Sequence, residues 1–177
     1  RVIGMGGSSL GSEAIYDFLR KKIKKNFSFV DDLDISNKIK NDKKCLNLIV
    51  SKSGETVETI VNSNLIIKRK DKNLFITENK DNYLYRLALK LKAEVIYHNN
   101  FIGGRYSVLS EVGMLPAELM GLDSRKFKKF DNLVANKKFL NSLIINVSNI
   151  LELIKRKKFN SVILNYDETA DNFLKWY

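Results

Sequence analysis

Residues 45–56 read Cys-Leu-Asn-Leu-Ile-Val-Ser-Lys-Ser-Gly-Glu-Thr, an apolar run that passes directly into small polar residues. Near-continuous apolar runs of this length are typical of strands buried on both faces of a parallel sheet. Residues 55–70 then show the apolar period of a helix. The stretch therefore predicts a strand, a polar turn and a helix, which is the repeating unit of a doubly wound α/β fold.

The rest of the chain repeats this alternation. The predicted strands are residues 2–3, 27–30, 45–50, 73–76, 94–97 and 161–164. The predicted helices between them are residues 9–25, 55–70, 83–92 and 109–120. Strands that alternate with helices favour right-handed crossovers, and so a doubly wound parallel sheet flanked by helices. The only proline, Pro116, lies inside the last of these helices, which should be kinked or begin late.

Two parts of the chain differ in pattern. Residues 1–122 are predicted to form the first domain, and residues 123–177 a helical connection and the start of a second domain. Within residues 125–158, five apolar side chains form a stripe at helical spacing: Leu143, Val147, Ile150, Leu151 and Ile154. We expect this stripe to belong to a hydrophobic core.

The composition argues against several classes of function. The 31 Lys and Arg exceed the 20 Asp and Glu, but the lysines are spread along the chain near predicted helix ends, so we expect a solvated surface and no nucleic-acid partner. No apolar run approaches the ~18 residues that cross a bilayer, so no membrane partner is expected. The single Cys45 favours a reducing, cytoplasmic compartment. The lone His98 has no partners in metal-ligand spacing, so no metal is predicted.

Three polar segments follow predicted strands, where open α/β sheets bind ligands. The first, residues 4–11, is rich in glycine, and Ser8 or Ser9 can cap the next helix. Alone it is a weak signal that fits a dinucleotide, a phosphate or no ligand. The sixth place counted from Gly4 is Ser9 rather than glycine, which argues against a nicotinamide cofactor.

The second segment, residues 51–56, offers three hydroxyls at a helix start, those of Ser51, Ser53 and Thr56. Hydroxyls and helix-end amides can converge on a phosphate with little entropy to lose. An ordinary cap, with Ser53 at the N-cap and Glu55 in the first turn, explains only part of this pattern. We therefore favour phosphate binding.

The third segment, residues 103–107, reads Gly-Gly-Arg-Tyr-Ser. Two glycines leave room for Arg105 to reach into a crevice, where a guanidinium can stabilise negative charge on substrate oxygens. The alternative is a surface arginine in a flexible turn, and the chemistry of the residues does not choose between the two.

Together the three segments resemble the phosphoglucose isomerase family. Residues 4–11 resemble its glycine-rich opening, residues 51–59 its phosphate loop in the bacterial form, and residues 103–116 its most diagnostic signature. The first two are shared loosely by all sugar isomerase (SIS) domains, whereas the third is specific to glucose-6-phosphate isomerases. The resemblance implies two SIS domains, of which this chain, truncated at both ends, contains the first.

The resemblance also implies roles for particular residues. They are sugar contact for Gly7 and Ser8, phosphate binding for Ser51, Lys52 (mainly through its backbone), Ser53 and Thr56, and stabilisation of an enediolate for Arg105 with Gly104 beside it. The orientation of Glu55, a carboxylate near a bound phosphate, is open, and we expect it to point outward.

The implied reaction interconverts glucose 6-phosphate and fructose 6-phosphate through a cis-enediolate, without metal or organic cofactor, in a cytoplasmic, homodimeric glycolytic enzyme. The family's base, a glutamate, and its ring-opening histidine lie in the second half. Residues 161–167 resemble the segment just before that glutamate, so we expect the chain to bind substrate better than it converts it. Acceptance of mannose phosphates is left open.

Two alternatives remain. One is a non-catalytic SIS domain that senses a sugar phosphate for a DNA-binding regulator, which residues 103–107 disfavour. The other is an SIS isomerase of amino sugars, which requires the Arg105 segment to be coincidental.

Overall fold

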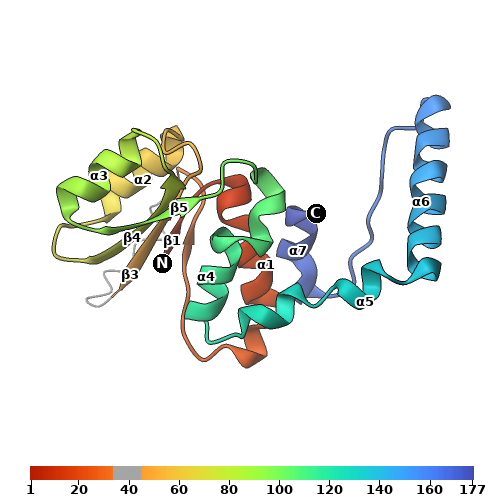
Figure 1. Cartoon of the computed structure of the whole chain (residues 1–177), viewed down its shortest axis with the longest axis horizontal. Helices are drawn as coiled ribbons and strands as arrows, with labels where there is room; N and C mark the ends of the chain where they lie inside the picture. The colour runs from red at the N-terminus through yellow and green to blue at the C-terminus, as the bar shows by residue number, and fades with distance from the viewer. Residues whose placement is uncertain (34–44) are drawn as a thin grey trace. The chain divides into compact units, whose positions relative to one another are not determined.

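The computed structural model describes residues 1–33 and 45–177 and contains a five-stranded parallel sheet (Figure 1). Its order is β2-β1-β3-β4-β5. The strands are β1 (Val2–Ile3), β2 (Phe29–Val30), β3 (Leu46–Val50), β4 (Lys72–Glu78) and β5 (Glu94–His98). Every neighbouring pair is parallel. The predicted doubly wound α/β fold is confirmed, and each of these strands overlaps a predicted one.

Four helices cover the two faces of the sheet. They are α1 (Leu10–Phe18), α2 (Val57–Ile66), α3 (Tyr83–Leu91) and α4 (Glu111–Leu119). Helices α2 and α3 lie on one face, and α1 and α4 lie together on the other (Figure 1). Successive residues of a strand point to opposite faces, so each strand contributes to both layers of the core.

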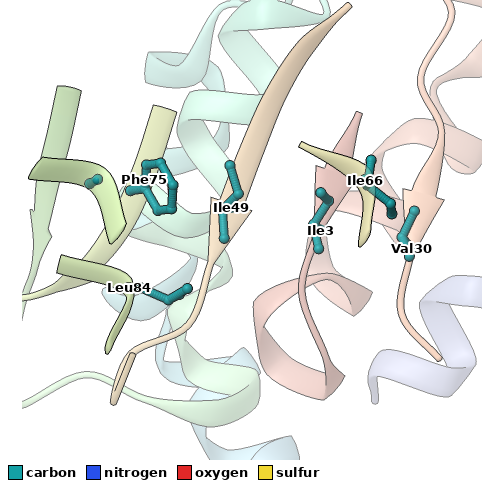
Figure 2. Packing of buried hydrophobic residues seen from close by; sticks show 7 residues of the cluster. Ile3, Val30, Ile49, Ile66, Phe75 and Leu84 are labelled. Atoms are coloured by element: carbon teal, nitrogen blue, oxygen red, sulfur yellow. The ribbon is translucent and has the colours of Figure 1, made fainter. Parts of the chain in front are cut away.

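The core consequently has two parts. Figure 2 shows the first, a cluster in which Ile3, Val30, Ile49 and Phe75 of the sheet pack with Ile66 of α2 and Leu84 of α3. The second, on the α4 face, contains Val2, Leu48, Val50, Ile76 and Val112. Burying each such side chain contributes about 1.5–3 kcal/mol, which makes the sheet a rigid platform for the loops at its edge.

Helix ends differ from the prediction for local reasons. Helix α1 stops at Phe18 because Arg20–Lys22 form a 3-10 turn and Ile23 then becomes extended and buries its side chain. Helix α2 begins at Val57 rather than at Glu55. Helix α4 begins at Glu111, two residues later than predicted, and Pro116 lies inside it.

The described chain divides into two compact units, residues 1–124 with 167–177, and residues 125–166. Helix α7 (Asp171–Trp176) belongs to the first unit, where it packs on α1 and Asn172 Nδ2 donates to Asp17 Oδ2 at 2.5 Å. The second unit contains α5 (Asp131–Val134) and α6 (Lys137–Lys155). No residue of the second unit is buried.

Two predictions about the second unit are wrong. Residues 161–164 form no strand, because a strand needs a neighbour for its backbone groups and none pairs with them in the described chain. The apolar stripe of α6 is not in a core, since Leu143, Val147 and Ile150 are about half exposed (48%, 48% and 55%). The apolar period of residues 143–154 correctly predicts a helix, but periodicity does not say which surface covers the apolar face.

Candidate functional site

The glycine loop (residues 4–9) and the serine loop (residues 51–56) follow two adjacent strands, β1 and β3. The helices that follow these loops, α1 and α2, lie on opposite faces of the sheet (Figure 1). The chain therefore winds in opposite directions from this point, which is the topological switch point where open α/β sheets bind ligands. The sheet order, rather than the loop sequences, places the two loops there.

The serine loop forms a tight turn that ends at the first turn of α2. Ser51 Oγ and Thr56 Oγ1 lie 2.9 Å apart, and the amide of Gly54 donates to Ser51 O at 3.2 Å. Thr56 is the N-cap of α2, but its hydroxyl does not cap the helix. The first-turn amides of α2 have no intrahelical acceptor and can receive an anion.

The alternative reading of the serine loop as a Ser53 cap is wrong. Ser53 Oγ accepts from the amide of Glu55 at 3.2 Å, within the turn and before the helix begins. Ser53 itself is exposed. The hydroxyls of Ser51 and Thr56 pair with each other and are not used as caps.

Gly54 fixes the shape of the serine loop. Its φ is +66°, and a Cβ there would lie 1.9 Å from Asn82 Oδ1. The same Oδ1 caps α3 by accepting from the Tyr85 amide at 2.9 Å. The serine loop is thereby packed against the start of α3, and only glycine fits at this contact.

The carboxylate of Glu55 is bound at the start of α3. Its Oε1 accepts from the amide of Tyr83 at 2.7 Å and lies 3.9 Å from an Arg86 guanidinium nitrogen. A carboxylate at a helix N-terminus is stabilised by the helix dipole. Glu55 is 55% exposed, so it does point outward, with its carboxylate engaged at the start of α3.

The arginine loop (residues 99–110) connects β5 to α4 and contains a 3-10 segment, Gly104–Leu109. Its backbone packs on the glycine loop, because a Cβ on Gly7 would lie only 2.3 Å from the carbonyl carbon of Gly104. The buried Ser107 hydroxyl reaches Gly104 O at 2.7 Å and Gly7 O at 3.2 Å. Two loops about a hundred residues apart in sequence are thus in direct contact.

The side chain of Arg105 is exposed, and its guanidinium makes no hydrogen bond or ion pair with any part of the chain that the structure describes. Its backbone is fixed, because the carbonyl of Arg105 accepts from Trp176 Nε1 at 2.9 Å. An anchored backbone with an unengaged guanidinium suits a residue that binds an anionic ligand.

The side chain of Lys52 reaches the arginine loop. Its Nζ donates to Asn100 O at 2.6 Å, lies 3.6 Å from Glu78 Oε1, and would be 3.3 Å from a Cβ on Gly103. The short hydrogen bond and ion pair with Lys80, and then the charge of Lys52, hold the pKa of Glu78 below its ordinary value, although burial acts in the opposite direction. Lys52 therefore links the serine loop to the arginine loop.

The base of the arginine loop is closed by a carboxylate. Glu111 Oε1 contacts Nδ1 of the buried His98 and accepts from the amide of Asn99 at 3.2 Å. Burial raises the pKa of Glu111, but hydrogen bonds from its own amide, from His98 and from Asn99 outweigh this and lower it. His98 is the last residue of β5.

The glycine loop caps no helix through a side chain. Ser9 is the N-cap residue of α1 by position, but its φ of −122° and ψ of −42° do not direct the hydroxyl at the helix amides, and the predicted serine cap is absent. The Ser9 hydroxyl is buried without a partner among the described residues. Ser8 ends a 3-10 turn and is half-buried.

The three loops are thus joined by particular contacts, those of Gly7 with Gly104 and of Lys52 with Asn100 and Gly103. The sequence did not point to three residues that hold these loops. Glu111 acts through a carboxylate contact across the loop, and Asn100 through its backbone carbonyl. Trp176 acts through an indole from a helix distant in the sequence. Across residues 1–33 and 45–177, no group of three or more His, Cys, Asp or Glu could hold a metal ion. Over the same ranges, no helix has both the length and the apolar character needed to cross a membrane.

The sheet and its flanking helices define a doubly wound α/β domain with three loops gathered at its switch point. The family model described as phosphoglucose isomerase matches residues 2–168, and the chain belongs to this family. The resemblance of the three polar segments is thereby confirmed at the level of the family.

Individual relatives agree with this assignment. A glucose-6-phosphate isomerase of Methanocaldococcus jannaschii is 36% identical, covering 99% of this chain and 47% of the relative. One of Acholeplasma laidlawii is 37% identical over 72% of this chain and 35% of the relative. A hypothetical protein of Thermus thermophilus shares the fold, with a TM-score of 0.75 at 23% identity over 99% of this chain and 46% of that chain. The chain spans less than half the length of the curated relatives it matches.

Proposed function

We propose that the complete protein interconverts glucose 6-phosphate and fructose 6-phosphate through a cis-enediolate, and that this chain supplies its phosphate-binding loop and Arg105. The family and its relatives named glucose-6-phosphate isomerase support the reaction class. The observation that carries the assignment of the site is the packing of Gly7 on Gly104, which places the arginine loop against the glycine loop at the switch point.

The phosphate would be held by the serine loop. The hydroxyls of Ser51 and Thr56, 2.9 Å apart, can both turn toward an oxyanion, and Ser53 and the backbone of Lys52 border the same turn. The first-turn amides of α2 add donors and a favourable dipole. Hydrogen bonds to a charged acceptor contribute about 1.5–3 kcal/mol each, so a few of them anchor the substrate.

Arg105 would stabilise the enediolate. Gly7 and Ser8 would contact the sugar, and Gly104 packs directly on Gly7, so the backbone next to Arg105 lies against the loop that would contact the sugar. A fixed cation that meets developing negative charge stabilises the transition state more than the ground state. We therefore assign Arg105 to the chemical step rather than to substrate affinity.

The catalytic base would come from the half of the relatives' length that this chain does not span. Two carboxylates at these loops have other partners, since Glu55 accepts from the Tyr83 amide and Glu111 accepts from His98 and Asn99. A base must reach the C1 and C2 protons with a free lone pair. We propose residues 1–122 as the first SIS domain and residues 123–177 as a helical connection and the start of the second SIS domain.

The wider setting follows from the same assignment. We propose a homodimeric, cytoplasmic enzyme of glycolysis, as the resemblance of the three polar segments to the phosphoglucose isomerase family implies. The substrates are the two sugar phosphates and no cofactor takes part.

The test compares this chain with the complete protein. We expect the chain to bind fructose 6-phosphate weakly, seen as amide shifts in residues 51–59 by NMR, without turnover in a coupled isomerase assay. In the complete protein, Arg105→Met should lower kcat by about 10²-fold and change KM little. Arg69→Met, an exposed arginine remote in the sequence from the three loops, is the matched control. Full activity of Arg105→Met would refute the assignment.

A further inference from the structure

The arginine loop is closed at its base by one carboxylate. The loop leaves β5 after His98 and enters α4 at Glu111, and Glu111 Oε1 binds both the ring of His98 and the amide of Asn99. The His98 side chain is 1% exposed and that of Glu111 is 26% exposed. Both ends of the loop are therefore fixed to one another in a largely buried contact.

This contact is not explained by helix capping. Ser110 is already the N-cap of α4, and its hydroxyl accepts from the amide of Val112. A carboxylate in the first turn of a helix is stabilised by the helix dipole, and this does not require its side chain to point across the loop. The side chain of Glu111 instead reaches back across the loop to two donors on the preceding strand end.

The closure matters because Arg105 lies between the two ends of the loop that it joins. Gly103 and Gly104 lie between the fixed ends, and the Arg105 guanidinium makes no bond of its own to the described chain. Fixing the ends of a loop removes conformations that its middle could otherwise sample. The position of Arg105 thus depends on contacts of its backbone and on the closed base.

We propose that Glu111, acting through His98 and the Asn99 amide, is a positioning residue for Arg105. Glu111 does not contact the substrate, and its effect on the reaction passes through the arginine loop. The inference deepens the proposed function and rests on it for its kinetic part. Its structural part, the order of residues 99–110, is independent of any substrate.

The test has a structural measurement on this chain and a kinetic one on the complete protein. Hydrogen exchange should show Glu111→Ala speeding amide exchange at least about tenfold within residues 99–110, with the sheet unchanged. In the complete protein, the same variant should lower kcat about tenfold with KM changed less than about twofold, because Arg105 acts on the transition state.

Three further variants separate positioning from a general loss of stability. Glu111→Gln keeps an oxygen for both donors and should restore most of kcat. His98→Leu fills the buried place without a donor and should speed loop exchange less than Glu111→Ala does. Glu118→Ala removes an exposed carboxylate of the same helix, bonded to Ser124, and should leave exchange and kcat as in the wild type.

The outcomes are decisive in each case. Wild-type exchange in residues 99–110 of both Glu111→Ala and His98→Leu overturns the proposal, as does a kcat loss that Glu111→Gln does not restore. If Glu111→Ala does not fold, His98→Leu decides the structural part. A wild-type complete protein without isomerase activity would remove the proposed function, whereas the exchange result would still test the closure of the loop.

Discussion

Gly7→Ala tests whether contact between the glycine and arginine loops places Arg105. The added Cβ would lie 2.3 Å from the carbonyl carbon of Gly104, 2.4 Å from its oxygen and 2.7 Å from its Cα, all backbone atoms that cannot rotate away. Ordinary contact begins at 3.4 Å, so the loops must separate by about 1.1 Å, the difference between 3.4 and 2.3 Å. Overpacking of this kind costs about 1–3 kcal/mol of unfolding free energy.

The functional loss should exceed the loss of stability. A displacement of about 1 Å at a catalytic group can lower the rate by about 10²-fold, so kcat of the complete Gly7→Ala protein should fall by that order. Urea denaturation of this chain gives the stability, and a coupled isomerase assay of the complete protein gives kcat. Gly121→Ala is the control, because Gly121 has a φ of +88° and open space, so it adds backbone strain without separating the loops.

The reasoning would be refuted by a Gly7→Ala protein with wild-type kcat and wild-type exchange in residues 99–110. It would also be refuted if Gly121→Ala lowered kcat as strongly, since loss of stability alone would then explain both variants.

Three other measurements test separate contacts. Thr56→Val removes one hydroxyl at nearly constant volume and should weaken fructose 6-phosphate binding roughly 10- to 100-fold by calorimetry, whereas unchanged affinity would exclude the serine loop as the phosphate site. Gly54→Ala should lower the unfolding free energy by about 2–3 kcal/mol in urea, because it strains a positive φ and displaces the cap Asn82; a loss below about 0.5 kcal/mol would contradict the geometry. The pKa of Glu78 is lowered chiefly by Lys80, so its stabilisation is present above the ordinary value of 4.5 and lost as the pH falls below it. Lys80→Met should therefore reduce the stability difference between about pH 6 and pH 3 in urea titrations, and an unchanged difference would show that the pair contributes nothing.

Much of the fold could be predicted from local pattern. Apolar runs such as residues 45–50 are typical of strands buried on both faces of a parallel sheet. Their alternation with segments of helical period indicates that helices connect the strands. The ends of helices were less predictable. Helix α1 ends at Phe18, shortly before Ile23, and the burial of Ile23 in the core is a tertiary contact. The apolar period of α6 was equally clear, yet the described chain leaves it exposed.

The sequence by itself determined which residue types stand at the strand ends: glycines at 4–7, hydroxyls at 51–56 and an arginine after two glycines at 103–105. Only the tertiary structure decided that these segments meet, because the sheet order places β1 beside β3 and the arginine loop returns to Gly7. It also decided that Lys52 reaches Asn100 and that Glu111 closes the loop on His98. Such contacts depend on distances across the folded chain, and local pattern carries no information about them.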